Sequence, residues 1–161
     1  MQVVSDADII IHLSRLGRLS LLQSLYTKIV IPEYVKSEIL NRDNADIQKA
    51  INSFINVVIT SNDKAEKIAK KHGIHIGEAH VKTLGKELKS SLFLSNEKKV
   101  RKTAKDEGFK VVGTIGIILR SVKKGIIEKS EAYSILKKMK SQHFRIHPDI
   151  IEKALMVLKD I

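Results

Sequence analysis

Short runs of β-branched and other apolar residues alternate with segments of helical spacing along the whole 161-residue chain. These runs do not alternate apolar with polar residues, which is typical of strands that are buried on both faces. Strands of this kind, separated by helices, favour a parallel sheet with right-handed crossovers. The pattern therefore predicts an α/β fold, a three-layer α/β/α sandwich with a parallel, roughly five-stranded sheet.

The strands are expected at residues 3–4, 28–31, 57–59, 92–94 and 110–112. The expected helices cover residues 9–13, 19–25, 32–41, 45–55, 63–72, 78–88, 97–107, 114–123, 130–139 and 148–158. No repeat or linker interrupts this pattern, so we expect a single domain over residues 1–161, with residues 128–161 as C-terminal covering helices.

Local signals set the predicted ends of several helices. Pro32 is expected at the first position of its helix, where proline is favoured. Ser61 or Asn62 is a cap for the helix that Gly73 ends. The pair 95–96, Ser-Asn, is a candidate cap for the helix that follows the fourth strand.

Composition narrows the class of protein. The chain contains no cysteine, which excludes disulfides and thiolate metal sites. Hydrophobic residues make up 43% and charged residues 29%, as in soluble globular proteins. No apolar run approaches the roughly 18 residues of a membrane span. The first residues lack the basic and apolar regions of a signal peptide, so we expect a cytoplasmic protein.

The formal net charge of +11 points toward a polyanionic partner such as nucleic acid. A lysine-rich surface that is merely solvated would give the same charge. Charge alone leaves both interpretations open.

Polar residues follow several of the predicted strands. Asp6 and Asp8 follow the first strand, Asn96 and Glu97 the fourth, and Thr114 the fifth. In open parallel α/β sheets, ligands bind outside the carboxyl ends of the strands. The sequence therefore predicts a polar site at this edge.

Two predicted helices add acids near the same edge. Glu38 lies about two turns into the helix after the second strand, and Glu78 opens the helix before the fourth. Simpler roles remain open for each acid: Glu78 and Glu97 complement helix dipoles, Glu38 lies on a solvated face, and Asp6 caps a helix. A carboxylate directly after a buried strand does, however, need a cap or a cation.

Several fragments resemble the PIN-domain family. They are VVSDADII (3–10), LGRLSLL (16–22), IVIPEYVKSEI (29–39), IGEAH (76–80), LFLSNEKKVR (92–101) and VVGTIGIILR (111–120). Each fragment is short, and their order along the chain carries the resemblance. It is closest to a prokaryotic, VapC-like branch and extends from residue 3 to about residue 155.

The resemblance implies a carboxylate cluster that holds Mg²⁺ or Mn²⁺ and hydrolyses RNA. It maps catalytic and metal-binding roles onto Asp6, Glu38 and Glu78, with Glu97 as a fourth acid. Crowded carboxylates repel one another, and a divalent ion removes that conflict. Oxygen-only ligands suit Mg²⁺ or Mn²⁺.

The sequence departs from the family pattern at two places. The family often has one or two Asp after the fourth strand, where this chain has Asn96 and Glu97, and a small hydroxyl residue where this chain has Asp8. Glu97 still offers a carboxylate on a longer side chain. Asn96 and Thr114 are expected to orient water or phosphate.

Phosphate binding also needs cations. Lys98, Lys99, Arg101 and Lys102 lie on the helix that Glu97 opens and are the expected RNA-backbone contacts. Aromatic residues make up only 4% of the chain, which favours contacts to the RNA backbone over base stacking.

We therefore predict a Mg²⁺- or Mn²⁺-dependent endoribonuclease, a phosphodiester hydrolase, as the toxin of a toxin–antitoxin pair. RNA, an antitoxin protein and a second copy of the chain are the expected partners, the last two from the resemblance alone. The alternative is a PIN-like domain that is inactive and binds RNA or a protein partner. Zinc is not expected, because His72, His75 and His80 straddle a turn without a His-Glu-x-x-His motif.

Overall fold

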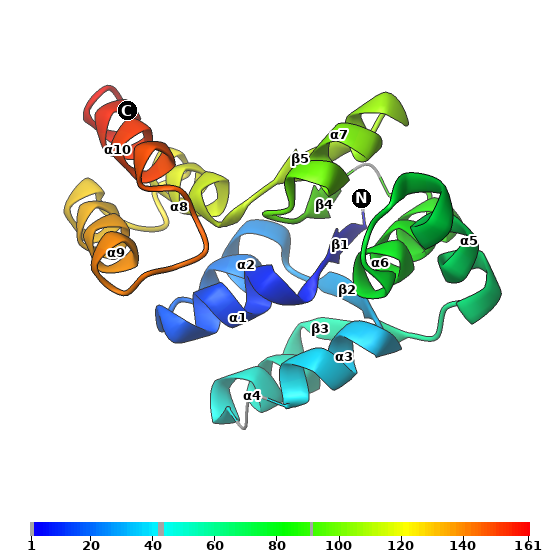
Figure 1. Ribbon diagram of the computed structural model, residues 1–161. Coiled ribbons are helices and arrows are strands. Elements are labelled where there is room, and N and C mark those ends of the chain that lie inside the picture. Colours follow the sequence, from blue (N-terminus) through cyan, green and yellow to red (C-terminus); the bar gives the residue numbers. More distant parts are fainter. Residues whose placement is uncertain (1, 42–43, 91) are drawn as a thin grey trace.

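The computed structural model describes residues 2–41, 44–90 and 92–161 (Figure 1). Its centre is a sheet of five parallel strands, which confirms the predicted fold class. The strands are β1 (Val3–Ser5), β2 (Ile29–Pro32), β3 (Ile55–Val58), β4 (Leu92–Leu94) and β5 (Lys110–Val112).

The strand order β3-β2-β1-β4-β5 places β1 at the centre of the sheet. Val4 of β1 pairs with Val30 on one side and with Phe93 on the other. The chain moves outward from β1 to β3, then crosses back to add β4 and β5. The strand order therefore reverses between β1 and β4, where ligands gather in open α/β sheets.

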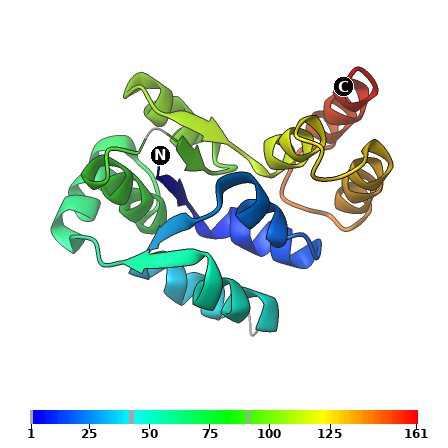
Figure 2. The same ribbon diagram turned by 180° about the vertical axis from the view of Figure 1, so that it is seen from behind.

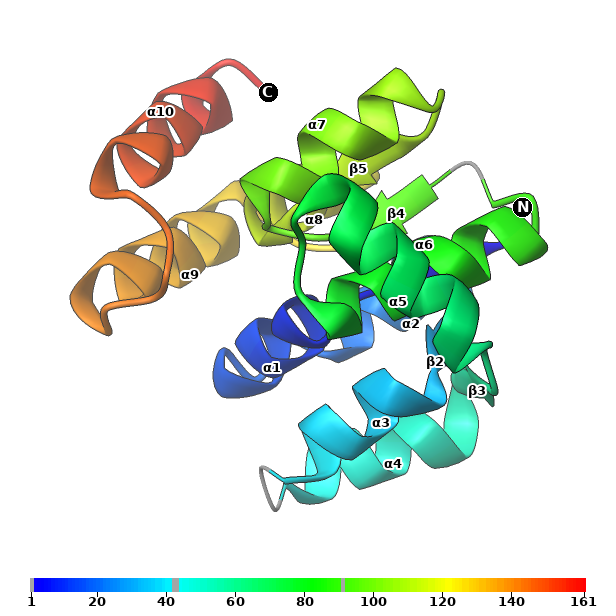
Figure 3. The ribbon, with the colours of Figure 1, turned by 45° about the vertical axis from the view of Figure 1, so that its right-hand side comes forward.

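Helices cover both faces of the sheet (Figure 3). They are α1 (Ala7–Arg15), α2 (Ser20–Tyr26), α3 (Glu33–Leu40), α4 (Ala45–Ser53), α5 (Asn62–His72), α6 (Ile76–Glu87), α7 (Lys98–Asp106), α8 (Thr114–Lys123), α9 (Lys129–Ser141) and α10 (Pro148–Lys159). In the described part of the chain, none of these helices has the length and apolar character needed to cross a membrane.

Buried apolar side chains form two main clusters. The larger surrounds the sheet and includes Val4, Ile10 and Phe93, all fully buried. The second includes Leu136 and Phe144 and lies among α8, α9 and α10. Figures 1 and 2 show these three helices together at one end of the sheet. A single domain over residues 1–161, with residues 128–161 as its C-terminal covering helices, stays a prediction.

Several predicted element ends are wrong by one or two residues. Pro32 is the last residue of β2 and caps α3 in extended conformation, with ψ 155°, because it still pairs with Val58. The helix expected to reach residue 55 ends at Ser53, since Ile55 already lies opposite Ile29 in the sheet. Ile59, expected inside β3, lies outside it and is 78% exposed.

Capping explains the helix ends near the candidate site. Ser61 caps α5 as predicted, and Gly73 ends it in a left-handed conformation with φ 61°. The cap of α6 is His75, so this helix begins two residues before the predicted Glu78. Glu97 caps α7 without a side-chain hydrogen bond, so the predicted cap at Ser95–Asn96 is wrong.

Candidate active site

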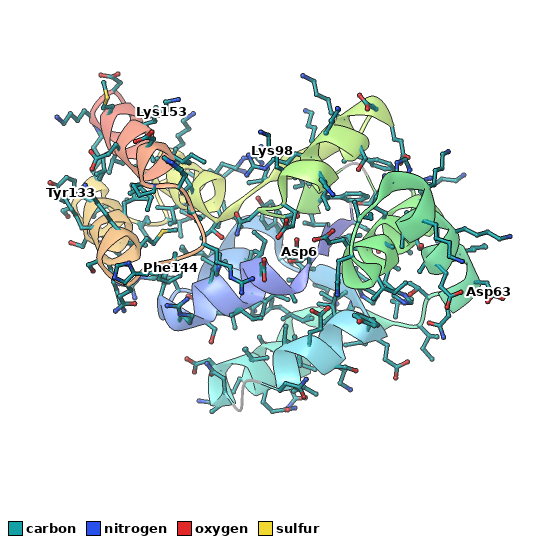
Figure 4. The ribbon with its side chains drawn as sticks, in the orientation of Figure 1. Asp6, Asp63, Lys98, Tyr133, Phe144 and Lys153 are labelled. Atoms are coloured by element: carbon teal, nitrogen blue, oxygen red, sulfur yellow. The ribbon has the colours of Figure 1, made fainter. Side chains whose placement is uncertain are left out.

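Five carboxylates from four parts of the chain line one cavity of about 220 Å³ at the carboxyl edge of the sheet. They are Asp6, Asp8, Glu38, Glu78 and Glu97. His75 and Arg145 line the same cavity. Figure 4 shows Asp6 near the centre of the molecule. We call this cavity the acidic pocket. It brings together all four acids to which the sequence assigned a catalytic role.

Asp6 holds the position where β1 meets α1. Its backbone N–H donates to the Leu94 carbonyl at 3.0 Å, which continues the pairing of β1 with β4. Its side chain caps α1 by accepting from the Ile9 N–H at 3.3 Å. Cap and pocket roles thus coexist in one carboxylate, which is only 6% exposed.

The charge of Asp6 is poorly compensated. Burial, together with the nearby carboxylates of Asp8 and Glu78, raises its pKa from 3.8 to about 7. Hydrogen bonds from Ser95 and from the Ile9 N–H act in the opposite direction. A cation beside Asp6 would favour its charged form.

Glu38 reaches the pocket from α3 because Gly77 leaves room for it. A Cβ atom at Gly77, in the first turn of α6, would lie only 2.6 Å from Oε1 of Glu38. Burial raises the pKa of Glu38; His75 opposes this and Asp8 adds to it. Glycine at position 77 therefore allows the carboxylate of one helix to meet the start of another.

Glu78 takes part in a capping box at the start of α6. Its Oε2 accepts from the His75 backbone N–H at 3.1 Å, while the His75 Nδ1 accepts from the Gly77 N–H at 3.1 Å. Glu78 therefore also has the simpler role considered above, because its Oε2 oxygen stabilises the start of α6. Burial raises its pKa, and the Glu97 carboxylate contributes in the same direction.

Glu97 and Asp8 complete the set of acids. Glu97 is half-buried at the start of α7, and its negative charge raises the pKa of Glu78. Asp8 lies one residue into α1 and raises the pKa of Asp6, Glu38 and Glu78 alike. Asp8 therefore faces three of the other acids, although the sequence gave no firm role to it.

These donors fit a hydrated divalent cation. Within residues 2–41, 44–90 and 92–161, no three acidic or histidine side chains are already close enough to enclose an ion. Mg²⁺, however, usually keeps several waters and binds through one or two carboxylates. Asp6, Glu38 and Glu78, whose pKa values are raised, are oxygen donors that a hard cation would stabilise in their charged form.

Asn96 and Thr114 lie beside the pocket and are not among its lining residues. The Asn96 Oδ1 accepts from the Thr114 N–H at 2.8 Å, and its Nδ2 donates to the Thr114 hydroxyl at 2.9 Å. The same Nδ2 lies 3.0 Å from the His12 Nδ1. These contacts tie the end of β4 to the start of α8. The expected role in orienting water or phosphate stays a prediction.

The four expected RNA-backbone cations are exposed on α7. Lys98 lies near the start of α7 (Figure 4), and Lys99 donates to the Gly73 carbonyl at 3.1 Å. Arg101 lines a second cavity beside β5, while Lys102 lines neither of these cavities. Their contact with RNA stays a prediction.

Sequence reasoning did not place His75 or Arg145 in the site. His75 precedes Ile-Gly-Glu, and its position before a helix was the available signal for a cap. Arg145 comes from the segment between α9 and α10, far from the acids in sequence. No local pattern marks it, because only the packing of the C-terminal helices brings it to the pocket.

The fold and the acidic pocket define an α/β sandwich with a carboxylate-lined site where the strand order reverses. A family model described as PIN domain matches residues 2–160, and the chain belongs to that family. The crystal structure of PAE2754 from Pyrobaculum aerophilum is similar in fold, with a TM-score of 0.57 and 14% sequence identity over 74% of this chain and 97% of that chain. No curated protein sequence matches the chain.

Proposed function

We propose that this protein is a metal-dependent endoribonuclease. The observation that carries the proposal is the meeting of five carboxylates in one pocket of a PIN domain whose net charge is +11. PIN domains are typically nucleases. The excess of positive charge outside the pocket suits a polyanionic substrate.

The chain's own residues have separable roles. Asp6, Glu38, Glu78 and Glu97 would hold Mg²⁺ or Mn²⁺, directly or through water. When bound, such an ion supplies Lewis acidity at the phosphoryl group and lowers the pKa of the attacking water. Because burial raises the pKa of Asp6 to about 7, this carboxyl would have to give up its proton in order to hold a cation near neutral pH.

Arg145 provides positive charge at the rim of the acidic pocket. A guanidinium is well suited to two parallel hydrogen bonds with phosphate oxygens. We assign to Arg145 the positioning of the scissile phosphate over the acids. Its exposed side chain can reach a phosphate at the pocket mouth without being buried itself.

The test replaces two acids without changing their shape. Asp6→Asn plus Glu38→Gln should lower Mn²⁺-dependent RNA cleavage by about 100-fold or more, since both would be metal ligands. Asp63→Asn plus Glu66→Gln on α5 is the matched control, because both side chains are exposed and Asp63 lies far from Asp6 in Figure 4. Unchanged cleavage by the pocket variant would refute the proposal.

A second candidate function is an inactive PIN-like domain that binds RNA or a protein partner. The observation that favours it is the Asn96–Glu97 pair, since Asn96 supplies no carboxylate and bonds to Thr114 instead. Calorimetry separates the candidates. Undetectable Mg²⁺ and Mn²⁺ binding at millimolar concentration, with RNA affinity intact, would favour the inactive domain.

The finer predictions belong to this proposal. The resemblance to VapC toxins supports a role as the toxin of a toxin–antitoxin pair in the cytoplasm. If a small reading frame adjoins the gene, expressing both chains together, followed by co-purification, tests the antitoxin. Light scattering tests the predicted homodimer.

A further inference from the structure

A second cavity lies along β5, which is an edge strand of the five-stranded sheet. It measures about 410 Å³ and is lined by Arg101 and Lys105 of α7, Lys110 of β5 and Arg120 of α8. Phe109, Val111 and Val112 form the apolar part of its lining. We call this cavity the basic groove. Of its lining residues, only Arg101 belongs to the expected RNA-backbone contacts on α7, and the other cations have no role assigned so far.

The basic groove has uncompensated positive charge. Its lining contains four cationic side chains and no acidic one. All four are exposed, and in the described part of the chain none lies within 4.0 Å of a carboxylate. A lysine on an edge strand can serve to prevent strand pairing, which explains Lys110 alone. Arg101, Lys105 and Arg120 come from helices and converge on the same groove.

The groove adjoins the acidic pocket through one turn of α7. Glu97 lines the pocket, and its carbonyl accepts the helical hydrogen bond from the N–H of Arg101 at 3.0 Å. The side chains of Arg101 and Asn96 both lie against Gly113, where a Cβ would be 2.6 Å from Oδ1 of Asn96. One helical turn is about 5 Å long, so a phosphodiester chain could pass from one cavity to the next.

We propose that the basic groove binds the backbone of single-stranded RNA on its way to the acidic pocket. This inference rests on the proposed function and adds the path of the substrate. Phosphates would contact the four cations, and the apolar lining would meet ribose or base. One face of Phe109 already stacks on Phe93, with ring centroids 4.6 Å apart, so backbone contacts dominate and sequence preference is weak.

The salt dependence of RNA binding tests the groove. Lys105→Ala plus Lys110→Ala removes two of its cations, and Lys67→Ala plus Lys70→Ala on α5 is the control with two exposed lysines of equal charge. Anisotropy of a labelled 2′-O-methyl RNA, measured in EDTA over a range of KCl, reports binding without cleavage. Thermal unfolding checks that both variants remain folded.

The expected result is a specific change in slope. Each phosphate contact with a single strand contributes about 0.7 to the slope of log K against log salt, so the groove variant should be shallower by about 1.4. Affinity at low salt should fall about tenfold. An unchanged slope, or an equal loss in the α5 control, overturns the proposal. If Lys105→Ala plus Lys110→Ala weakens binding of polyglutamate but not of RNA, the groove binds acidic protein and the proposal is also overturned.

This measurement separates the groove from the catalytic proposal. Asp6→Asn plus Glu38→Gln should leave the salt slope in EDTA intact, because it removes no cation from the groove. Suppose that the Asp6 and Glu38 variant loses cleavage while Lys105→Ala plus Lys110→Ala leaves the salt slope unchanged. The groove proposal then fails, and the nuclease proposal stands. If instead the salt slope depends on the groove cations but the protein cuts no RNA, the nuclease proposal fails and the groove proposal stands.

Discussion

The acidic pocket lies at the start of α7 and the basic groove lies further along the same helix, but the two differ in the sign and burial of their charges. The pocket gathers five carboxylates, and burial raises the pKa values of Asp6, Glu38 and Glu78. The groove displays four exposed cations along an edge strand. Charges taken out of water change their chemistry, whereas charges left in water mainly attract a partner. This difference is the reason why we propose chemistry for the pocket and binding for the groove.

The largest expected effect concerns how the buried Asp6 makes the free energy of unfolding of the protein depend on pH. A pKa raised from 3.8 to about 7 means that folded Asp6 keeps its proton to higher pH than unfolded Asp6. Its contribution is therefore fully favourable below pH 3.8 and is lost as pH rises to about 7. Asp6→Asn keeps the cap of α1 and should be more stable than the natural protein at pH 8 in EDTA, by at most about 4 kcal/mol.

Urea unfolding at pH 4 and pH 8 measures this difference. The two proteins should converge at pH 4, and Mg²⁺ should narrow the gap at pH 8 by stabilising the natural protein. Equal pH dependence in both would show that Asp6 is not desolvated in solution.

The second effect tests the close approach of two helices in the pocket. Gly77→Ala would place a Cβ 2.6 Å from Oε1 of Glu38 and displace the carboxylate. We expect Mn²⁺-dependent cleavage to fall by about 10- to 100-fold, because overpacking costs about 1–3 kcal/mol. The same change in a Glu38→Asp background should cost much less, because the shorter side chain leaves space. Additive losses in this double-mutant cycle would contradict the proposed contact.

The third effect asks whether Glu97 belongs with the other acids. It is half-buried, and its side chain is longer than the Asp that the resemblance to PIN domains led us to expect after the fourth strand. Glu97→Gln should weaken Mn²⁺ binding by about tenfold, with cleavage recovered at high Mn²⁺. Titration of cleavage against Mn²⁺ measures this shift. A loss that Mn²⁺ does not recover would assign Glu97 a role beyond metal affinity.

The smallest effect falls on the boundary between the two regions. Gly113→Ala would bring a Cβ to 2.6 Å from Oδ1 of Asn96 and against the Arg101 guanidinium. Arg101 can move at small cost, so we expect RNA affinity to fall by only about threefold. Cleavage at saturating RNA should stay near that of the natural protein. A large loss of cleavage there would show that Asn96 acts in the pocket itself.

The sequence predicted the fold well because strand burial and helix spacing are local patterns. The positions of β4 and β5 and the last residue of α5, His72, follow from such patterns and are confirmed. The start of β3 was misplaced because Ile55 joins the sheet through its pairing with Ile29, a contact that no local pattern specifies. The start of α6 was misplaced because the cap is His75, a residue type not expected there.

The candidate site shows the same division. The order of acids along the chain, together with the resemblance to PIN domains, was sufficient to name Asp6, Glu38, Glu78 and Glu97. The raised pKa values of Asp6, Glu38 and Glu78 were not accessible from sequence. The same is true of the opening that Gly77 leaves for Glu38 and of the presence of Arg145. These features depend on which surfaces exclude water and on helices distant in the chain.

The sequence by itself determined which side chains follow the strands and what net charge the protein carries. Only the tertiary structure decided that the acids would share one cavity while Arg101, Lys105, Lys110 and Arg120 would share another. The physical reason is that a strand end or a helix face is a local property of the chain. Burial and the distance between charges arise only when distant segments pack together.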